Sequence, residues 1–269
     1  RADLINEFQD PLNGSETDKS AYKKQATILF ERFFIKRSKK TVYVTKKACD
    51  RAKSMHADLA EKIIFCYPGA RRFTFAQDLE EFAPCITTPK QIELLHMGTL
   101  YGTRNLDVFF EALDELYSEG TVHKGDLKIV NLGSVYCDKK DKYLKRDDFT
   151  SIGEMSRIDA IKRAKMSDVL LIVQHGDSRS EETIPYKVYD YLNIELPIFG
   201  LVKNLELELL LQGAAHNSLI ADPADKKSIK RKIIELVKME MDFGPQSLVS
   251  GAMPAPTLKI SNQFLSILE

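Results

Sequence analysis

Hydrophobic positions in this 269-residue chain alternate between short continuous runs and stretches with helical spacing. The runs are rich in Ile, Leu and Val, and several end in glycine, which is typical of buried strands followed by tight turns. The stretches between them repeat apolar residues every three or four positions, as amphipathic helices do. After residue 90 we predict strands over 92–98, 127–134, 148–153, 169–176, 197–202 and 218–222. Helices are predicted over 106–117, between Gly153 and Ala164, over 186–192 and over 226–239.

The first part of the chain shows the same alternation on a smaller scale. A stretch with little periodicity, around Pro84 and Pro89, separates it from the second part. The elements predicted here are a helix over 22–36, a strand over 41–45, a helix capped by Thr45 and running to about residue 55, and a strand over 62–67.

Strands that alternate with helices and read as continuous apolar runs predict a parallel sheet with helices on both faces. Ligands of such sheets bind at the carboxyl ends of the strands, where the strand order reverses. Gly98, Gly133, Gly153 and Gly176 all lie at or just past predicted strand ends. The fold class is therefore α/β, and a ligand site is expected along this edge of the second part.

Composition and charge narrow the function classes. Lys plus Arg equals Asp plus Glu at 39 each, so no overall field favours nucleic acid. No apolar run is long enough to cross a bilayer, and the N-terminus does not resemble a signal peptide. The four cysteines and five histidines show no metal-ligand spacing. We expect reduced thiols, a cytoplasmic location, and neither a metal nor a cofactor.

The segment 177–197 follows one of the most hydrophobic runs and carries candidate chemistry. Pro185 and Lys187 stand between Glu182 and Asp190. Proline suits the first turn of a helix, whose free N–H groups bind anions. Lys187 adds a cation there, and Asp190, one turn beyond, can share its face of the helix. The segment therefore predicts a site that holds a phosphate beside a hydroxylated group.

Three motifs resemble those of family 4 glycosyltransferases. The pattern E-x-I-P-x-K-x-x-D-Y, followed by E-L-P-I-F-G, resembles the E-x7-E segment of that family. The stretch 96–107, H-M-G-T-L-Y-G-T-R-N-L-D, resembles its donor-phosphate loop, and 149–155, F-T-S-I-G-E-M, is similar to the strand and glycine beside its nucleotide base. Upstream, D-L-I-N-E-F-Q-D-P resembles the end of a strand in the family's N-terminal domain. The order of the motifs makes the resemblance fairly specific.

The resemblance implies a GT-B fold of two Rossmann-like domains. Residues 1–85 would be the end of the N-terminal acceptor domain with its linker, so that the chain would start inside that domain. Residues 86–250 would form the nucleotide-sugar-binding domain, and 251–269 the helix that crosses back. The implied activity is a retaining, metal-independent hexosyl transfer from a nucleotide-diphosphate sugar to a glycan or lipid-linked acceptor, as in polysaccharide biosynthesis.

The resemblance also implies roles for individual residues. Arg104 and Lys187 would stabilise the departing diphosphate, Glu182 would bind sugar hydroxyls, and Asp190 would bind the ribose. Glu181 competes with Glu182, but only Glu182 has the family spacing. Further substrate-binding residues are Gly98, Thr99, Gly153, Thr183, Ile184 and Pro185.

Three positions depart from the family pattern. Asp190 replaces a glutamate, Thr183 replaces a glycine, and Thr99 replaces an arginine, which leaves Arg104 as the main cation of the first loop. Two alternative functions therefore stay open. One is a nucleotide-sugar epimerase of the same fold, and the other is a non-catalytic module that binds a nucleotide or scaffolds a partner.

The basic helix expected within 20–40 and two histidines have open interpretations as well. Seven basic residues stand beside a wide apolar surface between Tyr22 and Lys40. Core packing is the interpretation we favour for that surface, and peripheral contact with an anionic membrane is the alternative. His96, within a strand, is expected in the core, whereas His175, at a strand end, fits a ligand contact or a cap equally well.

Overall fold

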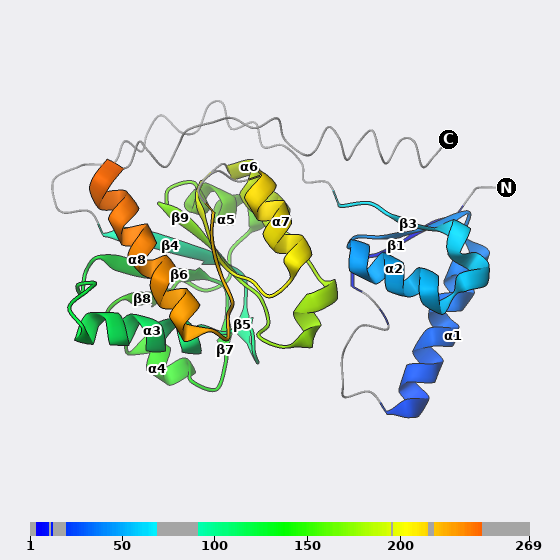
Figure 1. The fold of residues 1–269 in the computed structure, drawn as a ribbon, viewed down its shortest axis with the longest axis horizontal. Coiled ribbons are helices and arrows are strands. Elements are labelled where there is room, and N and C mark those ends of the chain that lie inside the picture. Colours follow the sequence, from blue (N-terminus) through cyan, green and yellow to red (C-terminus); the bar gives the residue numbers. More distant parts are fainter. Residues whose placement is uncertain are drawn as a thin grey trace.

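The computed structural model of the protein describes residues 4–10, 12, 20–68, 91–194, 196–214 and 218–243. The predicted linker around Pro84 and Pro89, the glycosyltransferase-like helix at 251–269 and Cys85 lie outside the described residues. Figure 1 shows two α/β units, a smaller one from the first part of the chain and a larger one from the second.

The smaller unit is a three-stranded parallel sheet in the order β1-β2-β3. The Thr45 side chain accepts a hydrogen bond from the backbone N–H of Ala48 at 3.4 Å, which confirms the predicted helix cap. Its elements are β1 (Ile5–Phe8), α1 (Ala21–Arg37), β2 (Lys40–Tyr43), α2 (Lys46–Met55), the 3₁₀ helix η1 (Ala57–Lys62) and β3 (Ile63–Phe65).

The larger unit is built on a six-stranded parallel sheet in the order β11-β10-β9-β4-β6-β8. All six strands were predicted from the sequence: β4 (Ile92–Met97), β6 (Leu127–Leu132), β8 (Phe149–Ser151), β9 (Val169–Val173), β10 (Ile198–Leu201) and β11 (Leu219–Ala221). The first strand along the chain, β4, lies beside the fourth, β9, so that the order reverses between them. This is the doubly wound Rossmann order, and the predicted α/β class is confirmed.

Helices cover both faces of this sheet (Figure 1). The buried side chains of α3 (Asp107–Ser118) and α8 (Lys226–Phe243) share one core with Leu94 of β4. Those of α5 (Arg157–Ala164), α6 (Lys187–Ile194) and α7 (Leu205–Ala214) share the other core with Leu95. The remaining elements are the parallel pair β5 (Leu100–Tyr101) and β7 (Val135–Tyr136), α4 (Lys140–Leu144) and the 3₁₀ helix η2 (Ser178–Glu182).

The structure corrects two local predictions. Helix α6 begins at Lys187, two residues after Pro185, because the N–H groups of Val188 and Tyr189 bond three residues back, to Pro185 and Tyr186, in a tighter turn. Helix α4 stands at Lys140–Leu144, where the sequence predicted no helix, and it buries Tyr143.

The apolar stripe of α1 is also placed differently from our preferred interpretation. The helix buries Ile35 and Glu31 against the small sheet, whereas Tyr22, Phe30 and Phe33 are 83%, 54% and 48% exposed. Core packing therefore accounts for only part of the apolar surface of this helix within the described residues.

Two glycine turns cross at the carboxyl edge of the large sheet. The backbone N–H of Gly98 donates to Leu132 at 2.7 Å, which draws the turn after β4 against the turn after β6. A Cβ built on Gly133 would lie 2.5 Å from the Gly98 carbonyl oxygen, closer than real side chains approach. Gly133 also has φ +149°, a backbone region that favours glycine.

We therefore expect Gly133→Ala to lower the free energy of unfolding by about 2–4 kcal/mol, from backbone strain plus overlap with Gly98. Gly125 is the matched control, because it has φ +108° but nothing within 4 Å of an added Cβ. Gly125→Ala should cost about 1 kcal/mol. Urea denaturation of both variants measures the difference, and equal losses would show that the crossing of the two turns tolerates a side chain.

Candidate functional site

A cavity of about 690 Å³ lies at the carboxyl ends of β4 and β9, where the strand order reverses. The smaller unit closes one side of it with Gln9, Asp10, Val44 and Pro68. The sequence-predicted residues that line it are Gly98, Arg104, Glu182, Thr183, Ile184, Pro185 and Lys187. The predicted residues Thr99, Gly153 and Asp190 are not among the residues that line it.

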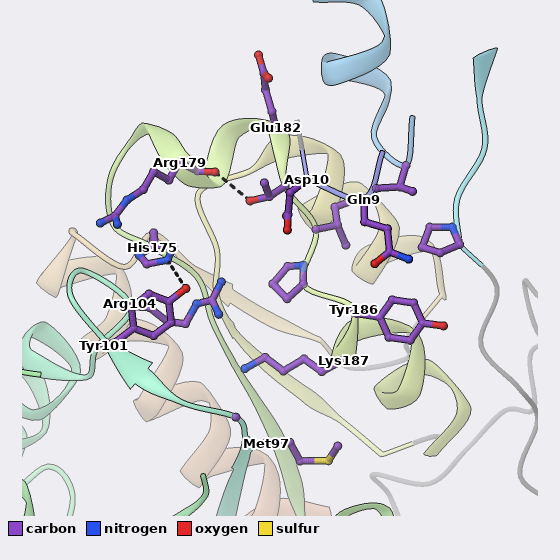
Figure 2. Close-up of a pocket in the computed structure, with 16 residues that line it drawn as sticks. Gln9, Asp10, Met97, Tyr101, Arg104, His175, Arg179, Glu182, Tyr186 and Lys187 are labelled. Carbon is purple, nitrogen blue, oxygen red and sulfur yellow. Dashed lines mark hydrogen bonds between the residues drawn. The ribbon is translucent and has the colours of Figure 1, made fainter. Parts of the chain in front are cut away.

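Two cations reach into this cavity without an acidic partner. Figure 2 shows the side chains of Lys187 and Arg104 extending into the same space, from the start of α6 and from the loop before α3. Within the described residues neither pairs with a carboxylate, and the buried Nε of Arg104 has no hydrogen-bond partner. Burial, and then the charge of Arg104, hold the pKa of Lys187 well below its usual range. The site thus favours an anion that neutralises both groups.

A third cation in the cavity is already neutralised. The Arg179 guanidinium donates to Asp177, with Nη2 2.6 Å from Oδ2, and holds the pKa of that carboxyl below its usual range. The hydroxyl of Thr103 donates to the same carboxylate at 2.6 Å. Arg179 therefore shapes the wall of the cavity rather than adding net charge to it.

His175 lies two residues after the end of β9 and lines the cavity. Its Nδ1 lies 3.0 Å from the Thr103 hydroxyl and its Nε2 lies 3.3 Å from the Tyr101 hydroxyl. Burial, aided by the charges of Arg104 and Arg179, lowers its pKa to about 4, so the ring is neutral at neutral pH. A neutral imidazole beside Arg104 adds a hydrogen-bonding wall without further charge.

Glu182 is held by the smaller unit. The residue is 6% exposed, and its carboxylate accepts a hydrogen bond at 2.8 Å from Nε of Arg51 on α2. The Thr45 hydroxyl donates to its backbone carbonyl at 2.8 Å. Figure 2 shows its side chain directed away from Lys187. Binding of sugar hydroxyls by Glu182 stays a prediction, and Arg51 is a partner that the sequence pattern did not indicate.

Arg51 connects this carboxylate to a second buried acid. Glu31 of α1 is fully buried, and its carboxylate accepts from the Tyr43 hydroxyl at 2.8 Å and lies 3.1 Å from Nε2 of His56. Nη2 of Arg51 lies 4.0 Å from it. One guanidinium therefore lies between an acid of α1 and an acid of η2.

Asp190 also has a partner that sequence reasoning missed. It is 3% exposed and accepts from Nη2 and Nε of Arg157, at 2.6 and 3.1 Å. Arg157 is the first residue of α5, after the predicted base-side glycine Gly153, which has φ +91°. The ribose role of Asp190 stays a prediction, and a ribose there would have to share the carboxylate with Arg157.

Sequence reasoning missed several residues that line the cavity. Tyr101 ends the short strand β5, and Arg179 lies in the 3₁₀ helix η2. The sequence around them gave no spacing signal, although both follow strands that end at the predicted edge. Gln9 and Asp10 belong to the D-L-I-N-E-F-Q-D-P stretch, whose position after β1 was the available signal.

Metal and membrane features are limited to what the described residues show. They contain no cluster of three His, Cys, Asp or Glu side chains that could bind a metal ion. None of the helices in this part of the chain combines the length and the hydrophobicity that a bilayer-crossing segment needs. Cys49, Cys66 and Cys137 are free and buried.

No protein-family model matches the chain, and no curated protein matches it. Among solved structures it is similar to Anabaena HepE in complex with UDP and glucose (11% identity, TM-score 0.62, covering 99% of this chain and 71% of that one). It is similar to Staphylococcus aureus TarM in a complex containing UDP (11%, 0.62, 99% and 51%) and to the pneumococcal O-GlcNAc transferase GtfA in complex with UDP and GlcNAc (12%, 0.56, 99% and 50%).

At these identities the likeness establishes the fold, and the predicted GT-B architecture is confirmed. This chain spans between 50% and 71% of the length of the three similar proteins.

The Arg51 contact yields a stability prediction. Arg51→Ala removes the guanidinium that lies between two buried acids, so we expect a loss of about 3 kcal/mol in the free energy of unfolding. Arg32 is the control, because it pairs with Asp58 on the surface through two hydrogen bonds. Arg32→Ala should cost less than about 1 kcal/mol. Urea denaturation tests this, and a loss for Arg51→Ala as small as for Arg32→Ala would contradict it.

Proposed function

We propose that this chain is the donor-binding part of a nucleotide-sugar glycosyltransferase of the family 4 type. The observation that carries the proposal is the convergence of Arg104 and Lys187 at the point where the strand order reverses, two cations that have no acidic partner among the described residues. A diphosphate supplies the charge and the acceptor oxygens that these groups lack. Parallel sheets of this order bind nucleotides at this point.

The same two cations explain how the site would assist the reaction. Breaking the bond between a sugar and a diphosphate leaves positive charge on the anomeric carbon and negative charge on the leaving group. Fixed cations that face the leaving group stabilise the transition state more than the ground state. In the proposed reaction Arg104 and Lys187 do this without a metal, and the sugar is transferred with retention of its configuration.

The remaining substrates of the reaction are also part of the proposal. The three similar structures hold UDP and a sugar or sugar derivative, so we propose a hexosyl donor and take UDP as the first nucleotide to test. The acceptor is a glycan or a lipid-linked sugar, as in polysaccharide biosynthesis. Gln9 and Asp10 face the donor side of the cavity from the smaller unit and would contact the acceptor.

An epimerase and a non-catalytic module are separated from this proposal by one assay. The protein is incubated with UDP-glucose and UDP-N-acetylglucosamine, with and without oligosaccharide acceptors, and the products are resolved by mass spectrometry and NMR. Transfer to an acceptor supports the glycosyltransferase, inversion at the sugar C2 or C4 supports the epimerase, and binding without turnover supports the module.

Peripheral attachment to an anionic membrane at the cytoplasmic face is the second part of the proposal. The exposed Tyr22, Phe30 and Phe33 of α1 stand among the basic residues Lys23, Lys24, Lys36 and Arg37. The Arg37 guanidinium lies over the Phe33 ring at 4.4 Å. Aromatic side chains beside lysines and arginines match the interface of a bilayer that contains anionic lipids.

Replacement of Lys187 tests the donor site. Lys187→Ala should weaken UDP binding about ten- to a hundredfold and leave uridine binding nearly unchanged, because a charge-assisted hydrogen bond contributes about 1.5–3 kcal/mol. Arg179→Ala is the matched control, a cation of the same cavity that Asp177 already neutralises, and its effect on UDP should be much smaller. Calorimetric titration measures both, and equal losses for UDP and uridine would remove Lys187 from the phosphate site.

A vesicle experiment tests α1. The double variant Phe30→Ser/Phe33→Ser should lose most of its co-sedimentation with vesicles of phosphatidylglycerol and phosphatidylcholine, since both rings insert at the interface. The control is Leu205→Ser/Leu209→Ser, which removes two exposed apolar side chains from α7 instead. The membrane contact would be refuted if the wild-type protein did not co-sediment with anionic vesicles. It would also be refuted if the double variant of α1 bound as well as the control.

A further inference from the structure

The amino group of Lys187 meets a buried ring that the proposed reaction does not use. Its Nζ contacts Nε2 of His96, a fully buried residue of β4. A Cβ built on Gly98 would lie 3.6 Å from Nζ and 3.9 Å from Cε1 of His96, so the bare backbone of the glycine turn lies alongside this pair. The prediction that His96 lies in the core is thus confirmed, and its ring also contacts Lys187.

The hydrogen bonds behind His96 determine which ring nitrogen carries the proton. Asn131 lies directly opposite His96 on the neighbouring strand β6. Its Nδ2 donates to the carbonyl of Gly133 at 2.7 Å, so its Oδ1 is the atom that faces Nδ1 of His96, also at 2.7 Å. An amide oxygen can only accept. Nδ1 therefore carries the proton, and Nε2 presents a lone pair to the amino group of Lys187.

The charges around His96 keep the ring neutral. The charged groups that face it are Lys187 from α6 and Arg104 from the loop before α3, while β6 contributes the uncharged Asn131 and β9 its apolar run Val169–Val173. Burial, followed by the charges of Lys187 and Arg104, holds the pKa of His96 well below its usual range. A protonated ring would turn a donor toward Lys187 and break the contact.

A neutral acceptor can position the Lys187 amino group without cancelling its charge, which a carboxylate would not do. A carboxylate would hold the amino group in place but cancel its charge, as Asp177 does for Arg179. A neutral imidazole restricts the position of the amino group and leaves its charge for a ligand. We propose that His96 and Asn131 are positioning residues, which hold the Lys187 amino group toward the donor diphosphate without neutralising it. This inference rests on the proposed function of the same site.

Inorganic pyrophosphate is the probe for the first test, because its binding does not depend on the nucleotide base. His96→Leu should weaken pyrophosphate binding about tenfold in the wild-type background and have almost no effect in the Lys187→Ala background. His96→Gln keeps an acceptor oxygen and should recover most of the affinity. If His96→Leu and Lys187→Ala weaken binding independently, or His96→Gln binds no better than His96→Leu, the positioning role is refuted.

A pH series provides a readout that a purely structural role would not move. Asn131→Asp places a carboxylate against Nδ1 of His96 and so favours the protonated ring. Pyrophosphate affinity should then decline on acidification at a higher pH than in the wild type. The inference is overturned if the variant is folded, as judged by thermal unfolding, and its pyrophosphate affinity declines at the same pH as that of the wild type.

The same titrations separate failure of the inference from failure of the proposed function. Wild-type protein that binds neither pyrophosphate nor UDP refutes the donor site and, with it, the role of His96. Wild-type binding that survives the changes at His96 and Asn131 refutes only the positioning role. Should His96→Leu fail to fold, His96→Gln and Asn131→Asp carry the test.

Discussion

The candidate site depends on one constraint, the reversal of strand order between β4 and β9. The connections that leave these two neighbouring strands run to opposite sides, so a space is left between them above the strand ends. The loop after β4 brings Gly98 and Arg104 to that space, and the segment after β9 brings His175 and, through η2, Lys187. Residues more than seventy positions apart in the chain meet there because the strands are parallel and adjacent.

The electrostatics of this space differ from those of the surrounding surface. Many lysines and arginines of the described residues pair with carboxylates, as Arg146 does with Asp114 and Asp148. Lys187 and Arg104 instead extend into the same cavity, and the amino group of Lys187 contacts a neutral histidine (Figure 2). Two like charges held together in a buried space destabilise the empty site. An anion relieves that repulsion, which is why the arrangement favours ligand binding over stability.

The sequence predicted the framework of the fold because its signals are local. Continuous apolar runs marked all six strands of the large sheet, and Thr45 marked the start of α2. Helix α7 was missed because L-E-L-E alternates with the period of a strand. The segment is a helix because the Asn204 side chain caps its N-terminus, where it accepts from the backbone N–H groups of Glu206 and Leu207. In the helix Leu207 and Leu211 lie one turn apart, and both are buried.

The site was predictable only as far as its residues share a motif. The E-x7-E pattern found Glu182, Lys187 and Asp190, but not the arginines that bind the two acids. Arg51 and Arg157 lie 131 and 33 residues from their partners, and nothing local in the sequence distinguishes them from other surface arginines. Long-range pairs of this kind are properties of the folded chain, because they arise only when the two elements pack together.

The pair of Arg51 and Glu182 has a consequence for how the two units act together. Glu182 belongs to the segment that leads from β9 to Lys187, and its carboxylate and its carbonyl are both held by the smaller unit. A displacement of α2 would therefore pull on the short segment that ends at the start of α6. Residues 183–186 connect Glu182 to that helix, and Ile184 among them is buried. The smaller unit is thus coupled to the position of Lys187 through the four residues 183–186.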